Sequence, residues 1–235
     1  MREAVAGGGL VGSRKAPAPA GRAERLGLHE LSPGERGADR LGLRVLAAAD
    51  DHAFSQELAG ERDGGQVLVF DLFLDSYPGA GPAPSGYDQG WATFRYHCAA
   101  VALTRELAWM AITGRRPPYN LYPGLKPRRL ATGERRADRR HRLYTEGPEA
   151  TSWMESPAAQ AWLADTLTAR LEDSRRGLIL ELGGANAMLG VRASDFAQPD
   201  EMVLARAARR GGCGPWPDEL LARLMTLRSL IEGGP

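Results

Sequence analysis

Hydrophobic and polar residues alternate most clearly between residues 66 and 75 of the chain. Leu68, Phe70, Leu72 and Leu74 fall on one face of a two-residue period, while the other face becomes mixed toward its end. Successive side chains of a strand point to opposite sides, so this spacing is typical of a β-strand. The pattern predicts a strand here, followed by a loop rich in glycine and proline.

Two more strands are predicted directly after this loop. Small and apolar residues alternate from Trp91 to Leu103, and a second apolar run spans Leu107–Ile112. Only Thr104–Glu106 separates the two runs, which is too short for a crossover helix. The short links predict an antiparallel meander of three strands.

Later in the chain, the turn sequence Gly183–Asn186 lies between the apolar segments Leu178–Leu182 and Ala187–Val191. This arrangement predicts a small hairpin. Two short strands are predicted at Tyr119–Tyr122, which lies between prolines and is therefore expected at an edge, and at Arg139–Thr145.

Helical periodicity dominates the C-terminal part of the chain. Ser156–Glu172 begins with a capping serine before a proline, and Pro217–Ile231 carries a continuous stripe of leucines. A weaker helix is predicted at Pro199–Arg210, and a partly periodic one over residues 39–58. Strands followed by helices indicate an α+β fold, in which an antiparallel sheet (meander plus small hairpin) packs against two or three helices.

The N-terminal residues have a different composition. Residues 1–38 are rich in glycine, proline and alanine and have too few apolar residues to offset the entropy of ordering. We expect a flexible, disordered arm over 1–38 and a single α+β domain over 39–235.

Composition narrows the function only slightly. The 235 residues carry a net charge of +1, and two cysteines give neither a disulfide framework nor metal-ligand spacing. No apolar run approaches the ~20 residues that cross a bilayer, and the glycines near the N-terminus do not suit a signal peptide. We therefore expect a cytoplasmic protein without a membrane span.

Known catalytic signatures are missing from the sequence. Asp50-Asp51-His52 is interpreted as a polar turn, Cys98 as a small core residue, and His97 as a solvated position beside Arg95. The glycines at 183–184 match neither a Walker nor a dinucleotide pattern, and no nucleophile elbow is found. We predict no metal and no cofactor, and no catalytic motif indicates an enzyme.

Basic charge is concentrated between Gly114 and Arg142. Ten basic residues and two acidic ones give this segment a charge of +8, so the rest of the chain sums to −7. Such polarity suits an anionic partner. The candidate partner-binding residues are Arg128, Arg129, Arg139, Arg140, Arg142 and Tyr144.

Three functions remain open from these observations. The leading hypothesis is a non-catalytic interaction module that binds an acidic protein surface through the arginines. The first alternative is binding of nucleic acid or phosphate, because Tyr119, Tyr122 and Tyr144 interleave with the arginines as in single-strand platforms. The second is an enzyme with an unrecognised site. If residues 139–145 form a strand, Arg140 and Arg142 share a face with Tyr144, while Arg139 points the other way.

The order of these landmarks also resembles a known group of proteins. Gly64-Gly65 precedes an apolar strand with a Phe70-Asp71 pair, and the basic segment 139–144 precedes a tryptophan-containing helix and the short apolar strand Leu178–Leu182. This order resembles a group of uncharacterised α+β proteins from high-GC bacteria, some of which carry membrane-anchoring segments. The resemblance spans residues 60–191 and implies the α+β order and a bacterial source, but no activity.

Overall fold

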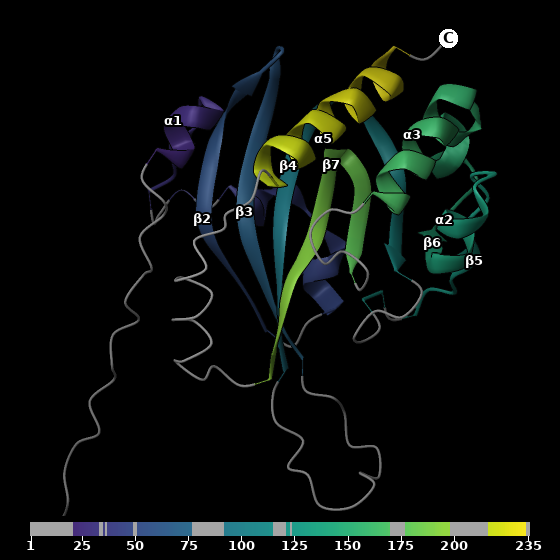
Figure 1. Ribbon diagram of the computed structural model, residues 1–235, viewed down its shortest axis with the longest axis horizontal. Helices are drawn as coiled ribbons and strands as arrows, with labels where there is room; N and C mark the ends of the chain where they lie inside the picture. Colours follow the sequence, from purple (N-terminus) through teal and green to yellow (C-terminus); the bar gives the residue numbers. More distant parts are fainter. Residues whose placement is uncertain are drawn as a thin grey trace, which may run out of the picture.

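In the computed structural model, an antiparallel sheet of seven strands is covered by helices on one face (Figure 1). The structure describes residues 21–32, 35, 37–48, 51–76, 92–114, 121–122, 124–169, 177–197 and 216–233. The strands are β1 (His29–Glu30), β2 (Asp51–Arg62), β3 (Gly65–Ser76), β4 (Ala92–Gly114), β5 (Arg128–Arg129), β6 (His141–Thr145) and β7 (Leu178–Ala197). The helices are α1 (Arg22–Leu26), α2 (Arg135–Arg140), α3 (Pro157–Thr168) and α5 (Trp216–Glu232), with 3₁₀ helices η1 (Ala38–Leu41), η2 (Arg44–Ala48) and η3 (Glu149–Glu155).

The sheet begins with tight antiparallel pairing. A two-residue turn at Asp63 and Gly64 joins β2 to β3, and both residues have positive φ, 47° and 71°. Aspartate followed by glycine is the preferred pair for such a turn, because its backbone twist matches that of the flanking strands. β3 then pairs with the first half of β4 from Val67 to Ser76, as the alternation of the sequence predicts.

The centre of the sheet consists of two long strands that double back. β4 and β7 pair along nearly their whole length, with register shifts between Ala102 and Met110. The two arms of β7 lie side by side. At their open end, the Arg192 amide donates to the Gly177 carbonyl at 2.7 Å, although these residues are far apart in sequence. Figure 1 shows the β7 hairpin between the two arms of β4. The predicted hairpin and the predicted strands at 91–103 and 107–112 are therefore present. The hairpin lies between the two arms of β4, so these arms are not adjacent as the predicted meander requires.

The two faces of the sheet have separate cores. The helix face, which α3 and α5 cover, packs the leucine stripe of α5 against strand residues such as Val69, Ala99 and Leu189. Burying each large aliphatic side chain stabilises the fold by about 1.5–3 kcal/mol. The opposite face carries Phe70, Leu72 and Tyr96 and is covered partly by the segment 37–46. The predicted antiparallel α+β fold is confirmed.

Several local predictions are wrong. The predicted helix over 39–58 is instead two 3₁₀ helices followed by β2. Phe54 and Leu58 belong to β2 and pack into the cores on opposite faces of the sheet, so they do not form a helical stripe. In the predicted strand Arg139–Thr145, the first two residues end α2, which Glu134 caps through the Ala137 amide. Leu121 and Tyr122 form a bend.

The N-terminal boundary also differs from expectation. Within the predicted arm, residues 21–32 form α1 and β1, and Leu26, Leu28 and Ala38 are buried in the two cores. Disorder is therefore wrong for this part of the arm, while residues 1–20 lie outside the described residues. The predicted helix Pro199–Arg210 also lies outside them. The division of the chain into arm and domain stays a prediction.

Candidate functional site

The described part of the arginine segment lies at one end of the sheet, in β5, α2 and the start of β6 (Figure 1). Within the described part of the chain, none of its exposed arginines forms an ion pair or a side-chain hydrogen bond. These exposed residues and the half-buried Arg142 are called the basic edge: Arg128, Arg129, Arg135, Arg136, Arg139, Arg140 and Arg142.

The two acidic residues of the segment bind the local backbone and do not pair with these arginines. Glu134 Oε2 accepts a hydrogen bond from the Ala137 amide at the start of α2. Asp138 Oδ1 accepts from both the amide and the hydroxyl of Thr132, each at 2.8 Å. The carboxylates therefore shape the loop that presents α2, and the positive charge of the basic edge remains available to a partner.

Strand alternation divides the basic edge between the two faces of the sheet. Arg129 lies directly opposite Arg142 in the β5–β6 register, and Arg142 shares a face with Tyr144. Arg128 lies opposite Leu143, whose side chain belongs to the helix-face core together with Ala137 of α2. Arg128 and α2 thus lie on the helix side, and Arg129 and Arg142 on the opposite side.

This arrangement corrects the predicted grouping of the arginines. Arg139 and Arg140 are neighbours on the exposed surface of α2, so the expectation that Arg140 shares a strand face with Arg142 is wrong. The cause is the helical turn before β6, which removes residues 139 and 140 from the alternation. The basic residues of one continuous segment therefore reach both sides of the sheet.

The tyrosines of the segment are core residues. Tyr144 is 6% exposed and Tyr122 is 2% exposed, and their ring centroids are 5.2 Å apart. Tyr122 also contacts the Trp109 ring edge-on at 5.1 Å. Bases stack on exposed aromatic faces, so these two rings do not form the expected stacking platform for nucleic acid. Tyr119 lies outside the described residues.

Beside these rings lies a buried carboxylate on the opposite face, Glu181, which is 1% exposed. Its Oε1 accepts from the Arg44 amide at 2.5 Å and from Trp109 Nε1 at 3.0 Å. Its Oε2 accepts from the Tyr122 hydroxyl at 2.8 Å and the Val45 amide at 3.2 Å. Desolvation raises the pKa of Glu181 more than these four donors lower it. The carboxyl group fastens η2 to the sheet.

A second buried carboxylate lies on the helix face. Asp71 is fully buried, with His97 Nδ1 2.6 Å from Oδ1 and Arg95 donating to Oδ2 at 2.5 Å. Desolvation is the largest single influence and raises the pKa of Asp71, but the bonds and charges of His97 and Arg95 together outweigh it and lower that pKa. His97 thus joins a buried charged cluster and is not the solvated position that the sequence suggested.

Both buried carboxylates were missed in the sequence, although a signal was present. Asp71 follows Phe70 within an apolar strand, and Glu181 interrupts the apolar run Leu178–Leu182. A single acidic residue inside an otherwise apolar strand indicates a buried charge, and a buried charge requires partners. Nothing in the spacing identifies those partners, because they come from β4, η2 and the bend at Tyr122.

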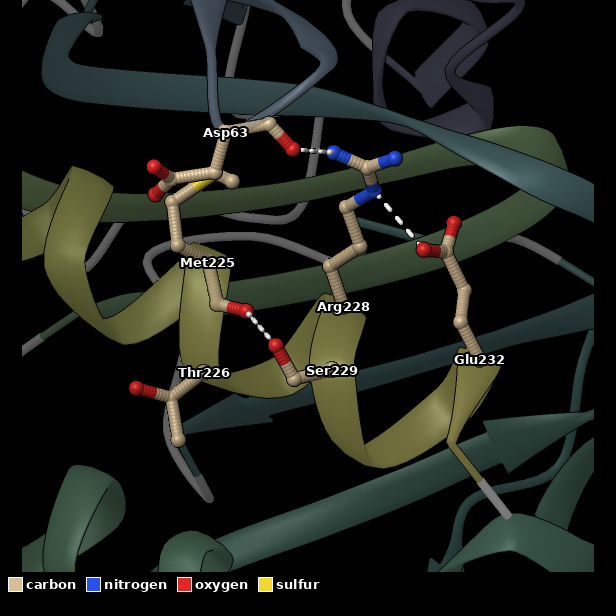
Figure 2. A pocket seen from close by; sticks show the side chains of 6 residues that line it. All are labelled: Asp63, Met225, Thr226, Arg228, Ser229 and Glu232. Carbon is tan, nitrogen blue, oxygen red and sulfur yellow. Dashed lines mark hydrogen bonds and ion pairs between the residues drawn. The ribbon is translucent and has the colours of Figure 1, made fainter.

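One open pocket of about 290 Å³ lies between the β2–β3 turn and the last turns of α5 (Figure 2). Arg228 crosses it, donating to the carbonyls of Asp63 and Gly64 and pairing with Glu232 at 2.9 Å. Glu232 also accepts from the Thr104 amide at 2.7 Å, which ties α5 to the β4 bend. These contacts hold α5 against the β2–β3 turn and the β4 bend, so Arg228 and Glu232 in the pocket wall have a structural role.

Metal ligands, thiols and membrane-spanning helices are the remaining features of the described residues that bear on function. The described side chains include no group of three or more His, Cys, Asp or Glu residues placed to hold a metal ion. Cys98 is a buried free thiol whose pKa is raised by burial. None of the helices that the structure describes has both the length and the apolar character needed to cross a bilayer.

Comparison with known proteins supports the fold. No family model matches the chain, and no curated protein matches its sequence. The crystal structure of the mycobacterial trehalose monomycolate transport factor A, TtfA, is similar, with a TM-score of 0.51 and 15% identity over 91% of this chain and 92% of that chain. This likeness shows a shared fold, and it supports the α+β part of the resemblance to proteins of high-GC bacteria.

Proposed function

We propose that the protein is a non-catalytic interaction module that binds an acidic partner protein through the basic edge. The observation that carries this proposal is the set of exposed arginines without ion pairs on β5 and α2, beside carboxylates that bind backbone amides instead. Exposed, unneutralised charge of one sign attracts a partner of the other sign and steers its approach.

Two further observations support an acidic protein over nucleic acid as the partner. Tyr122 and Tyr144 are buried, so the basic edge offers phosphate contacts but no stacking surface from these rings. The chain as a whole has a net charge of only +1, which is low for a nucleic-acid-binding protein.

The similarly folded protein gives the role a context. TtfA is named as a transport factor, which supports an accessory, non-catalytic role for this chain as well. We expect the partner to be met in the cytoplasm, because a chain with two cysteines, of which Cys98 is a free thiol, suits a reducing compartment.

A fluorescent twelve-residue glutamate-rich peptide tests this proposal. We expect its anisotropy to report binding that weakens as salt rises, because exposed charges are screened beyond about 8 Å at physiological ionic strength. Replacing Arg139 and Arg140 by glutamate should weaken binding at least about tenfold, since each exposed charge contact contributes up to about 1 kcal/mol and reversal replaces it with repulsion.

The control carries the same change of charge elsewhere. Arg40 and Arg105 are exposed and lie outside the basic edge, so the Arg40→Glu, Arg105→Glu variant should bind nearly as the wild type does. Equal loss in both variants, or binding that salt does not affect, would refute the proposal. Tighter binding of a twelve-nucleotide single-stranded DNA with the same dependence on Arg139 and Arg140 would favour nucleic acid.

A further inference from the structure

The outermost strand at this end of the described sheet, β5, is only two residues long, and its two arginines point to different faces. Arg128 lies on the helix side, where α2 adds Arg139 and Arg140. Arg129 lies on the opposite side. A ligand at this edge therefore meets positive charge on both faces of the sheet.

The opposite side carries an uncompensated pair of like charges. Arg129 and Arg142 are direct cross-strand neighbours, a position in which side chains are about 5 Å apart and like charges destabilise the pairing. Arg142 Nη1 donates to the His141 carbonyl at 2.9 Å, so its guanidinium binds its own neighbouring backbone and not a carboxylate.

No carboxylate of the described residues relieves this pair. Glu146 directly follows β6, but it pairs with Arg44 at 2.5 Å. Asp138 and Glu134 bind the backbone on the helix side. Two adjacent guanidinium groups without a counter-charge suit a carboxylate from another molecule, which they bind by charge-assisted hydrogen bonds.

We propose that an acidic segment of the partner crosses the β5 edge and binds both faces at once, with one carboxylate between Arg129 and Arg142 and others against Arg139 and Arg140. This inference rests on the proposed function and adds the path of the partner. Because β5 is the outermost strand at this end of the described sheet, the segment can run around the edge of β5 from one face to the other. Twelve extended residues span about 40 Å, and four span about 13 Å, so only the longer segment reaches both faces.

The test compares a twelve-residue and a four-residue glutamate peptide on the full chain. Once one end of the longer peptide is bound, its second contact forms within the same complex. The longer peptide should therefore bind at least about a hundredfold more tightly than the shorter one. The Arg129→Gln, Arg142→Gln variant should lose most of that gain. In this variant, the weaker binding of the short peptide should still depend on Arg139 and Arg140. The Arg40→Gln, Arg105→Gln variant is the matched control.

A measurement without peptide separates binding from folding. Arg129→Gln relieves the repulsion, so its unfolding midpoint should stay the same or rise while its affinity for the long peptide falls. If Arg142→Gln lowers the midpoint through its lost bond to the His141 carbonyl, Arg129→Gln alone decides the test.

The outcomes distinguish the two proposals. If the Arg129 and Arg142 variants bind the long peptide as the wild type does, and reversal of Arg139 and Arg140 still abolishes binding, the partner stays on one face and this inference fails. If neither set of arginines affects binding, the proposed function fails as well. Tighter binding of the twelve-nucleotide DNA through all four arginines would overturn the acidic protein segment as the occupant.

Discussion

Asp71 and Glu181 are two almost completely buried carboxylates on opposite faces of the same sheet, and their surroundings differ in one respect. Asp71 is bound by Arg95 and His97, side chains that carry or can carry positive charge. Glu181 is bound by four neutral donors, two of them backbone amides of η2. The pKa is lowered for Asp71 and raised for Glu181.

The difference shows that burial alone does not determine the charge of a side chain. Desolvation is the largest influence at both sites and raises both pKa values. Cationic partners reverse that effect for Asp71, because they favour the ionised form by charge as well as by hydrogen bonding. Neutral donors at Glu181 reduce the effect of desolvation without reversing it. Asp71 is therefore a charged anchor, whereas burial shifts the pKa of Glu181 toward the protonated form.

The largest effect is expected from removing the charged anchor. Asp71→Ala should destabilise the protein by about 3–5 kcal/mol, because it leaves the buried ends of Arg95 and His97 without a counter-charge. Urea unfolding followed by fluorescence measures the loss. A change below about 1 kcal/mol would mean that solvent already screens this cluster. Asp71→Asn is the control, since it keeps the shape and one acceptor oxygen.

Replacing the Glu181 carboxyl group should cost less stability than removing Asp71. Glu181→Gln keeps one acceptor oxygen but turns an amide toward donors that it cannot satisfy, so we expect a loss of about 1–3 kcal/mol. The same unfolding experiment measures this loss. The Glu181→Gln variant should lose less stability than the Asp71→Ala variant. A larger loss at Glu181 than at Asp71 would reverse the comparison.

The two sites should give pH dependence of opposite sign. The pKa of Asp71 is below its ordinary 3.8 in the folded protein, so its contribution to stability is present above that pH and is lost as pH falls through the lower folded value. The pKa of Glu181 is above its ordinary 4.5, so its contribution is present below pH 4.5 and is lost as pH rises through the folded value. Each single proton changes stability by at most about 1.4 kcal/mol per pH unit.

Unfolding at a series of pH values measures these slopes. The stability of the wild type relative to Glu181→Gln should decline as pH rises above 4.5. The stability of the wild type relative to Asp71→Asn should decline as pH falls below 3.8. Slopes of the same sign would disprove the assigned difference between the two sites.

The smallest effect is expected from removing a single neutral donor. Tyr122→Phe deletes the hydroxyl bonded to Glu181 Oε2 and keeps the ring against Trp109 and Tyr144, so the loss should be about 1 kcal/mol. It should also raise the pKa of Glu181 further, since that donor lowers it. Adding Tyr122→Phe to Glu181→Gln should cost less than the sum, and strict additivity would mean that the two groups do not interact.

Alternation in the sequence was sufficient to predict β3, both arms of β4, the β7 hairpin and the stripe of α5. It failed where local geometry competes with alternation. The 3₁₀ helix η2 depends on Glu181, which is more than 130 residues away and binds the Arg44 and Val45 amides. Arg139 and Arg140 belong to a single helical turn that a cap from Glu134 begins. The concentration of arginines was visible in the sequence, but its division between two faces depends on the pairing of β5 with β6.

The insertion of the β7 hairpin between the arms of β4 has a consequence for the order in which the chain assembles. The arms of β4 lie within about twenty residues of each other in sequence, yet the first pairs with residues 186–197 and the second with residues 179–184. During synthesis the centre of the sheet therefore stays open until more than sixty further residues have left the ribosome. Contacts of such long range slow the folding of a domain, because the entropy of closing the loop is lost before the pairing is gained. The last third of the chain thus determines when the first two thirds can finish folding.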